Sequence, residues 1–257
     1  MRLSRRDALR VGGGLLATAG AAGCVERRIT SRETRVQDSS SWALSPAVDA
    51  SLGESAFQEY VDEMADTYDD SGVWGLDAEP ADSFEGAYVQ RLGIPEDEPG
   101  ESSLDPDSLD LESPLLVADA AVAVYEVDDG VYRYWLWAAA DGTDDRLVRN
   151  VDVSVLSARV VFRNGTLSGA ADVERDGDEA TVSLGGAPEG SFPLKETTGS
   201  VESTSQQEQE DDPSYGVDWS GGVEGAQSVN GVCEEERDGA HDFFWRIAAG
   251  YTYTEQS

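Results

Sequence analysis

The stretch VYRYWLWAAA, residues 131–140, decides the fold because it reads as a β-strand that is apolar on both faces. Successive side chains of a strand point to opposite faces, so Tyr132 and Tyr134 point one way while Trp135 and Trp137 point the other. A strand of this kind lies in the centre of a sheet, with another sheet or a helix packed over each side. The sequence therefore predicts a layered fold built around this strand.

Turn signals and short β-type runs continue in both directions from this strand. The predicted strands cover residues 115–127, 131–140, 147–156, 159–163, 166–174 and 180–184. Asn164-Gly165 is the strongest hairpin signal, and Asp-Gly pairs at Gly130 and Gly177 predict two further hairpins. The pattern indicates an antiparallel meander or sandwich of about six strands, and hence a mainly β or α+β fold.

The end of the chain repeats the pattern of the central strand. The sequence FWRIAAG, residues 244–250, echoes YWLWAAA, residues 134–140, at the same spacing. Two strands in similar surroundings of one sheet would explain the echo. Helical spacing of Phe244 and Ile247 is the alternative, but the YTYT sequence that begins at Tyr251 favours a strand.

An amphipathic helix is predicted ahead of the strands, from residue 55 to about residue 70. Ser55 and Gln58 form a capping box at its start. Its apolar face is formed by Phe57, Tyr60, Val61, Met64 and Tyr68. Acidic residues occupy the opposite face, so we expect this helix to cover one face of the sheet.

A second, weaker helix is predicted over residues 83–92. Phe84, Tyr88 and Leu92 fall at helical spacing, and Gly93 would end the helix. Neither helix carries a cofactor motif, so both are expected to contribute to the core.

Two acidic segments interrupt these elements. Residues 95–114 hold eight acids, four prolines and no basic residue, and are predicted to form a linker or a long solvated loop. Residues 196–213 are polar and acidic, and are predicted to form a disordered insertion. Residues 45–257 are expected to form a single extracellular domain that contains both segments.

The first 24 residues predict where the protein works. The pair Arg5-Arg6 leads into an apolar run of 12 residues, 11–22, which is followed by Gly23 and Cys24. This arrangement resembles the signal read by the twin-arginine exporter, joined to a lipoprotein cleavage site. The run is far shorter than the roughly 20 residues that a membrane-spanning helix needs. The resemblance implies that residues 1–23 are a signal peptide and that Cys24 carries a lipid.

A lipid on Cys24 would anchor the exported protein to the outer face of the cell membrane. Residues 24–44 are polar and Ser-rich, and are expected to form a tether between the membrane and the domain. Four arginines of the tether would face an anionic lipid surface, namely Arg27, Arg28, Arg32 and Arg35. An uncleaved or ordinarily cleaved signal, with Cys24 as a bystander, is the alternative.

The chain is strongly acidic. It has 18 Lys and Arg against 52 Asp and Glu, a net charge of −34, and loss of residues 1–23 would make this −37. Molar salt screens the self-repulsion of such a chain, because the Debye length falls to about 3 Å at 1 M. With the export signal, the composition resembles that of an extracellular protein of a halophilic archaeon. Cation capture or a polybasic partner is the alternative reading of the charge, and nucleic acid is disfavoured as a partner.

Few residues are suited to catalysis. His241 is the single histidine and no Gly-x-Ser-x-Gly motif is present, so a Ser-His-Asp site would need His241 with Asp238 or Asp242 and an unidentified serine. A surface or loop histidine beside two aspartates is the expected state. Cys233 is followed by three glutamates, which raise the pKa of its thiol and predict an unreactive side chain.

Calcium is the one cofactor that the sequence suggests. The DVERDGD sequence places four acids, Asp172, Glu174, Asp176 and Asp178, in the alternation of a helix–loop–helix calcium loop. The closing glutamate is missing, and a hairpin turn explains the same residues without an ion. No cofactor is therefore expected, with calcium as the alternative. Asn164 begins an Asn-Gly-Thr glycosylation sequence, which a tight turn would block.

These observations predict a lipid-anchored extracellular protein whose domain binds a protein or small-molecule partner and does not catalyse. The alternative is a lipoprotein that binds a small ligand or a divalent cation. Trp135, Trp137 or Trp245 would line its pocket, although core packing is the simpler explanation for these side chains. A carboxylate-based hydrolase of the cell envelope is the third hypothesis. Two facing carboxylates in a cavity would favour the hydrolase, and an apolar pocket would favour the binding protein.

Overall fold

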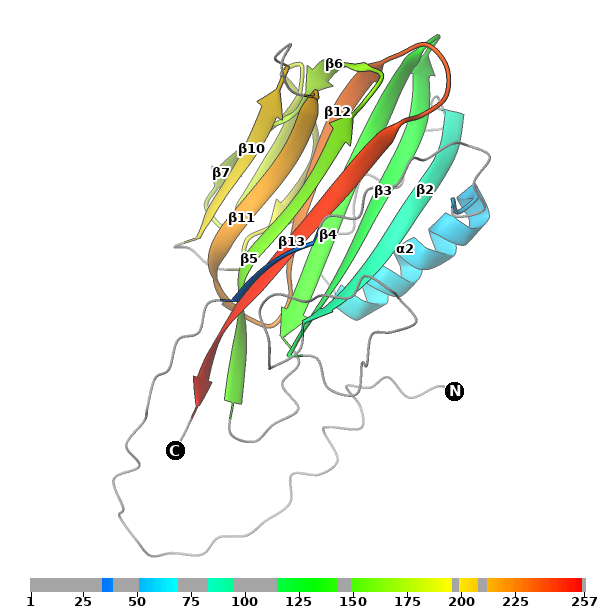
Figure 1. Ribbon diagram of the computed structural model, residues 1–257. Coiled ribbons are helices and arrows are strands. Elements are labelled where there is room, and N and C mark those ends of the chain that lie inside the picture. The colour runs from blue at the N-terminus through cyan, green and yellow to red at the C-terminus, as the bar shows by residue number, and fades with distance from the viewer. Residues whose placement is uncertain are drawn as a thin grey trace, which may run out of the picture.

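The computed structural model describes residues 34–38, 51–68, 83–94, 115–142, 149–195, 199–207 and 212–255. Within them the chain is mainly β, with antiparallel strands in three sheets and one described helix (Figure 1). The mainly β class predicted from the sequence is confirmed. No helix in the described ranges is long and apolar enough to cross a membrane.

Two five-stranded sheets and one three-stranded sheet make up the fold. Sheet A contains, in spatial order, β1 (Thr34–Asp38), β13 (Phe243–Glu255), β5 (Arg149–Phe162), β11 (Ser214–Glu224) and β10 (Ser200–Gln206). Sheet B contains β2 (Ser83–Ile94), β3 (Leu116–Asp128), β4 (Val131–Gly142), β12 (Gln227–Glu236) and β6 (Thr166–Ala170). Sheet C contains β7 (Asp172–Asp176), β8 (Glu179–Leu184) and β9 (Ala187–Pro193). The helix, α2, covers Glu54–Tyr68.

Strand β4 contains residues 131–140 and is the middle strand of sheet B. On one face, its Tyr134 ring meets Phe162 of sheet A edge to face, with ring centroids 4.9 Å apart. On the other face, Trp137 meets Tyr68 of α2 in the same way at 5.7 Å. The predicted central strand, with a sheet over one face and a helix over the other, is confirmed.

The helix α2 lies where the sequence predicts a helix from residue 55 to about residue 70. Its buried side chains are Phe57, Val61, Met64 and Tyr68. Phe57 stacks on Phe84 of β2, with ring centroids 5.9 Å apart. Because each such side chain contributes about 1.5–3 kcal/mol on full burial, packing against sheet B holds the helix in place.

Residues 83–92 form a strand, so the helix predicted there is wrong. They belong to β2, which pairs antiparallel with β3. Phe84, Tyr88 and Leu92 are four residues apart, a spacing that puts side chains on one face of a helix and also on one face of a strand. The spacing alone does not separate the two structures, and pairing with the apolar strand β3 selects the strand.

The chain crosses from sheet A to sheet B at Asn164-Gly165, where the sequence predicts a hairpin. Strand β5 ends at Phe162 and pairs with β11 and β13, whereas β6 starts at Thr166 and pairs with β12. A type I′ hairpin needs a positive φ at both turn residues. Gly165 is not among the described glycines with positive φ, and a Cβ there would collide with the Glu235 carboxylate. This glycine therefore allows two segments to approach closely, and the hairpin prediction is wrong.

The other two predicted hairpins are present. Strands β3 and β4 pair through the turn at Gly130 (φ +75°), and β7 and β8 pair through the turn at Gly177 (φ +68°). Elsewhere the pairing does not follow the order of the chain: β12 lies between β4 and β6, and β13 lies between β1 and β5. Among the described strands, only β2–β4 and β7–β9 follow one another as a meander would, so the antiparallel pairing is confirmed, whereas the predicted meander or sandwich of about six strands is not.

The C-terminal run forms strand β13, as its YTYT sequence favours. Its echo of the central strand does not place both in one sheet, because β13 lies in sheet A and β4 in sheet B. The two strands meet across the core instead, where Tyr134 and Phe243 pack edge to face with centroids 5.1 Å apart. Both strands have neighbours on each side within their own sheet, which accounts for their similar composition.

Two segments predicted as irregular chain contain strands. Strand β1 lies within the predicted tether, residues 24–44, and pairs with β13. Strand β10 lies within the predicted disordered insertion, residues 196–213, and pairs with β11. These two strands form the edges of sheet A, and polar edge strands lack the apolar alternation that would reveal them. The predicted signal peptide, residues 1–23, and the acidic segment 95–114 lie outside the described residues.

Candidate functional site

A hollow of about 270 Å³ lies between α2 and the first strands of sheet B. Its principal lining side chains are Tyr60, Glu63 and Met64 of α2, Val89 and Arg91 of β2, and Asp119 of β3. The Arg91 side chain is 47% exposed, whereas the Asp119 side chain is 3% exposed. Val89 is the one large hydrophobic side chain that is exposed in the described part of the chain. The hollow therefore combines a buried acid, a half-exposed base and an apolar surface.

Asp119 holds Arg91 in a fixed orientation. Arg91 Nε donates to Asp119 Oδ1 at 2.8 Å, and Arg91 Nη2 donates to Oδ2 at 3.0 Å. Tyr68 Oη donates to the same Oδ2 at 2.7 Å. A bidentate pair of this kind fixes the plane of the guanidinium as well as its position. Because arginine carries five N–H donors and Asp119 takes two of them, three remain directed away from the acid.

The phenols beside this pair stay protonated. Burial, followed by the Asp119 charge, raises the pKa of Tyr60 and that of Tyr68. The hydrogen bonds with Asp119 raise the pKa of Arg91 despite its partial burial. Near neutral pH the hollow thus presents a cationic guanidinium between neutral hydroxyl groups.

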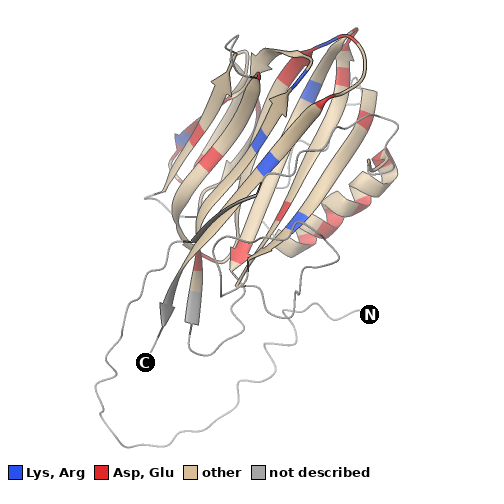
Figure 2. Cartoon of the chain, viewed as in Figure 1, with Lys and Arg blue, Asp and Glu red and all other residues tan. Residues whose placement is uncertain are grey.

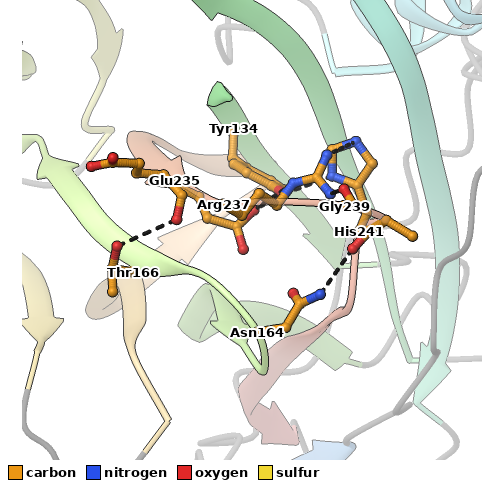
Figure 3. Close-up of polar contacts among 9 residues, drawn as sticks. Tyr134, Asn164, Thr166, Glu235, Arg237, Gly239 and His241 are labelled. Carbon is orange, nitrogen blue, oxygen red and sulfur yellow. Dashed lines mark hydrogen bonds and ion pairs between the residues drawn. The ribbon is translucent and has the colours of Figure 1, made fainter. Parts of the chain in front are cut away.

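A second polar cluster lies at the other end of sheet B, enclosed between sheets A and B (Figure 3). It consists of Tyr134 of β4, Glu235 of β12, and Arg237 and His241 from the connection between β12 and β13. Tyr134 and Glu235 are 0% exposed, and Arg237 and His241 are each 6% exposed. Polar groups at this depth must satisfy one another, because water does not solvate them.

The four side chains form a ring that is closed by three hydrogen bonds and one ion pair. Tyr134 Oη donates to Glu235 Oε2 at 2.5 Å, so its oxygen accepts from His241 Nδ1 at 3.0 Å. We therefore assign the proton of neutral His241 to Nδ1. His241 Nε2 then accepts from Arg237 Nη2 at 2.6 Å, and Arg237 Nε closes the ring 3.3 Å from Glu235 Oε2. We call these four residues the buried ring.

The pKa values of His241, Glu235 and Tyr134 are shifted within the buried ring. Burial, followed by the Arg237 charge, lowers the pKa of His241 to about 4. Burial raises the pKa of Glu235, although the Tyr134 hydrogen bond and Arg237 oppose the rise. Burial and the Glu235 charge raise the pKa of Tyr134. A proton on His241 Nε2 would face the Arg237 donor, so protonation of the imidazole opens the ring.

Contacts around the buried ring fix its position. The Arg237 guanidinium lies 3.9 Å from the centroid of the Tyr132 ring, a cation–π contact. Asn164 Nδ2 donates to the Ala240 carbonyl at 2.9 Å and ties the sheet crossing to the loop that carries His241 (Figure 3). Glu235 Oε1 accepts no hydrogen bond from the described residues. The ring is therefore a tightly enclosed unit whose second carboxylate oxygen has no protein donor in the described ranges.

His241 lies in a loop as expected, but it is buried and not at the surface. Its two ring nitrogens contact Tyr134 and Arg237, and neither hydrogen bond involves Asp238 or Asp242. Because both nitrogens are occupied, His241 does not activate a serine in this arrangement.

Cys233 is buried and free in the middle of β12. Burial raises the pKa of its thiol, and Glu235 and Glu234 raise it further. The predicted direction of the shift is confirmed, although burial outweighs the glutamates that the sequence emphasises.

The structure does not bring the predicted calcium ligands together. Asp172, Glu174 and Asp176 are exposed on one face of β7, and Asp178 lies in the following turn. Alternate residues of a strand are about 7 Å apart along its axis, too far to close around one ion. In the ranges that the structure describes, no group of three or more His, Cys, Asp or Glu side chains is placed to hold a metal ion.

The tryptophans of the predicted pocket belong to the core. Trp135, Trp137 and Trp245 are 6%, 1% and 4% exposed. The core explanation is therefore confirmed, and none of the three tryptophans lines the hollow beside α2. At the predicted glycosylation site, the Asn164 amide nitrogen that would carry a glycan already donates to Ala240. Arg5, Arg6 and Cys24 lie outside the described residues.

Sequence reasoning missed the pair Arg91 and Asp119. Asp119 is the single charged residue in LVADAAVAV, residues 116–124. A charge in such an apolar strand is buried and needs a partner, so the run itself signals a polar site. The partner lies on another strand, and only the pairing of β2 with β3 identifies it.

The described charges are unevenly distributed (Figure 2). Helix α2 has five acids and no basic residue. On the outer side of sheet A, Arg159 and Arg246 stand directly opposite each other in register, and Arg159 also lies 3.3 Å from Asp218. The acidic character of the chain is therefore strong on the helix side, next to the hollow.

No protein-family model matches this chain, and comparisons with curated proteins and with solved structures gave no match.

Proposed function

We propose that this protein is lipid-anchored on the outer face of the cell membrane, and that its β domain binds a partner or ligand without catalysing a reaction. The arginine pair Arg5-Arg6 and the cysteine that ends the apolar run support export and lipidation at Cys24. The net charge of −34 supports a salty exterior as the working environment.

The observation that carries the anchoring is Cys24 at the end of the apolar run, and the position of β1 indicates how the anchored domain would be presented. The first residue of β1, Thr34, follows Cys24 by ten residues and pairs with Tyr251 of β13. Ten residues of fully extended chain span at most about 36 Å. A lipid on Cys24 would therefore hold this edge of sheet A close to the membrane and present the rest of the domain to the outside.

The hollow beside α2 supports binding as the role of the domain, and a small ligand is the second candidate for what is bound. Asp119 is committed to Arg91 and Tyr68, so it does not act as a second catalytic carboxylate opposite Glu63. His241 is engaged on both nitrogens within the buried ring. These contacts favour a binding protein over the carboxylate hydrolase.

Fractionation of cells that express Cys24→Ser tests the anchoring. We expect the unaltered protein in the membrane fraction, with a mature mass increased by the lipid, and the variant in the medium or as an unprocessed precursor. Cys233→Ala is the matched control, because it removes the other cysteine of the chain. Membrane retention of Cys24→Ser at the same mature mass as the unaltered protein would overturn the proposal.

A further inference from the structure

We propose that the hollow between α2 and β2 binds a small zwitterion, a molecule that carries an ammonium and a carboxylate on a short apolar body, as free α-amino acids do. The inference rests on the small-ligand function proposed above and names its ligand class. It is carried by the side chains that three separate elements direct to one place: α2, β2 and β3.

Arg91 is built to receive the carboxylate. Its guanidinium is held by two hydrogen bonds to Asp119, at 2.8 and 3.0 Å, and is nevertheless 47% exposed. The three N–H donors that Asp119 does not take lie on the remaining edge of a fixed plane. A guanidinium held in this way loses little side-chain entropy on binding, which favours recognition of a planar carboxylate.

Glu63 supplies the opposite charge across the hollow. It is an exposed acid on α2 and lines the same hollow as Arg91 of β2. The charges of both residues reach the hydroxyl of Tyr60, where Arg91 lowers the pKa and Glu63 raises it. An ammonium beside Glu63 and a carboxylate beside Arg91 would each find an opposite charge.

Val89 provides most of the exposed apolar surface of the hollow, and Met64 lies beneath it. Met64 is 1% exposed, and Val89 is exposed over 36% of its surface. A ligand with a short aliphatic side chain would cover Val89, and the volume of about 270 Å³ is enough for such a small molecule.

The charge balance of the hollow excludes simpler ligands. Glu63 and Asp119 against Arg91 leave a net negative charge among the lining residues, which repels a plain anion. Arg91 repels a metal cation, and its hydrogen bond engages the Asp119 carboxylate that such a cation would need. A ligand that carries both charges meets neither objection.

Isothermal titration of the unlipidated mature chain, Cys24→Ser without residues 1–23, tests the inference with three probes. Leucine carries both charges, 4-methylpentanoate lacks the ammonium, and isoamylamine lacks the carboxylate. We expect leucine to bind, and each of the other two to bind at least tenfold more weakly, because each loses one charged hydrogen-bonding partner.

Variants separate the two charged contacts. We expect Glu63→Gln to weaken leucine at least tenfold, whereas 4-methylpentanoate should bind as before or more tightly, because one repelling charge is removed. The double variant Arg91→Gln, Asp119→Asn removes both charges together, so the buried Asp119 is not left unpaired, and it should weaken leucine and leave isoamylamine unchanged. Glu59→Gln, the same change at an exposed position of α2, is the control and should bind leucine as the unaltered chain does. Thermal melts confirm that each variant is folded.

Two results would overturn the inference, and they differ in whether the proposed small-ligand function fails with it. If 4-methylpentanoate or isoamylamine binds as tightly as leucine, the zwitterion is wrong and a small-ligand function stands. If none of the three produces heat, or if leucine binds Glu63→Gln and the double variant without loss, the hollow is not the ligand site. The membrane fractionation of Cys24→Ser is independent of both.

Discussion

Protonation of His241 makes the stability of the folded chain depend on pH. Its pKa of about 4 lies below the ordinary value of 6.5, so between these values the unfolded chain binds a proton that the folded protein excludes. Stability that is present above pH 6.5 is therefore lost as the pH falls toward 4, by about 2 kcal/mol at pH 5. Glu235 changes the stability in the opposite sense. Because its pKa is raised, the folded protein binds a proton more readily than the unfolded chain, and this adds stability as the pH falls.

Denaturant unfolding at pH 8 and pH 5, both in molar salt, measures this effect. We expect His241→Gln to lose less stability over this interval than the unaltered protein, and Glu235→Gln to lose more. Equal losses in all three proteins would show that the buried ring does not hold His241 in its neutral form.

At the scale of single residues, a lone charge is easier to predict than its partner. Asp119 stands out because the strand around it is apolar. Glu235 does not, because it sits between Glu234 and Glu236 and only the alternation of β12 turns it inward, to 0% exposure. The ring partner Tyr134 is 101 residues away in sequence, a separation that no local pattern bridges.

At the scale of elements, Gly165 sets how closely the crossing from β5 to β6 approaches β12. A Cβ there would collide with Glu235, so we expect Gly165→Ala to lower the free energy of unfolding by about 1–3 kcal/mol, as overpacking does. Gly86→Ala is the control, because the nearest atom to the Cβ that it would add is 3.5 Å away, an ordinary van der Waals contact. Equal free energies of unfolding for both variants would contradict the role given to Gly165.

Elements whose signal is local could be predicted, and those that depend on a distant partner could not. The hairpins at Gly130 and Gly177 need only a positive φ at the turn, which the sequence can indicate. The run 83–92 and the pair Asn164-Gly165 carry equally good local signals. Their structure is decided by β3 in one case and by Glu235 in the other.

At the scale of the whole molecule, the net charge of −34 makes folding depend on salt. At millimolar ionic strength the Debye length reaches about 30 Å or more, so acids across the entire domain repel one another. We expect dialysis from molar to millimolar salt to unfold the domain, with loss of the far-ultraviolet circular dichroism of its sheets. Sodium chloride and potassium chloride should restore it equally if screening is the cause. A signal that is unchanged between molar and millimolar salt would contradict this.

The order of the strands is the part of the fold that the sequence does not reveal. Composition and alternation predict a mainly β, antiparallel chain, and the charge pattern predicts its solvated surface. The insertion of β12 between β4 and β6, and of β13 between β1 and β5, depends on pairing between remote segments. The buried ring arises from the pairing of β12 with β4, and the hollow arises where α2 packs on β2 and β3, so neither site could be located before the sheets were known.

Thr34 stands opposite Tyr251, so the first and the last strand of the described chain are neighbours in one sheet. Because these two strands are neighbours, the chain could be circularly permuted. If its ends were joined and it were opened at the turn before β8, every strand would keep its partners. The strand pairings thus do not require the lipid to be attached at the amino end. A lipid attached after β13 would anchor the same edge of sheet A to the membrane.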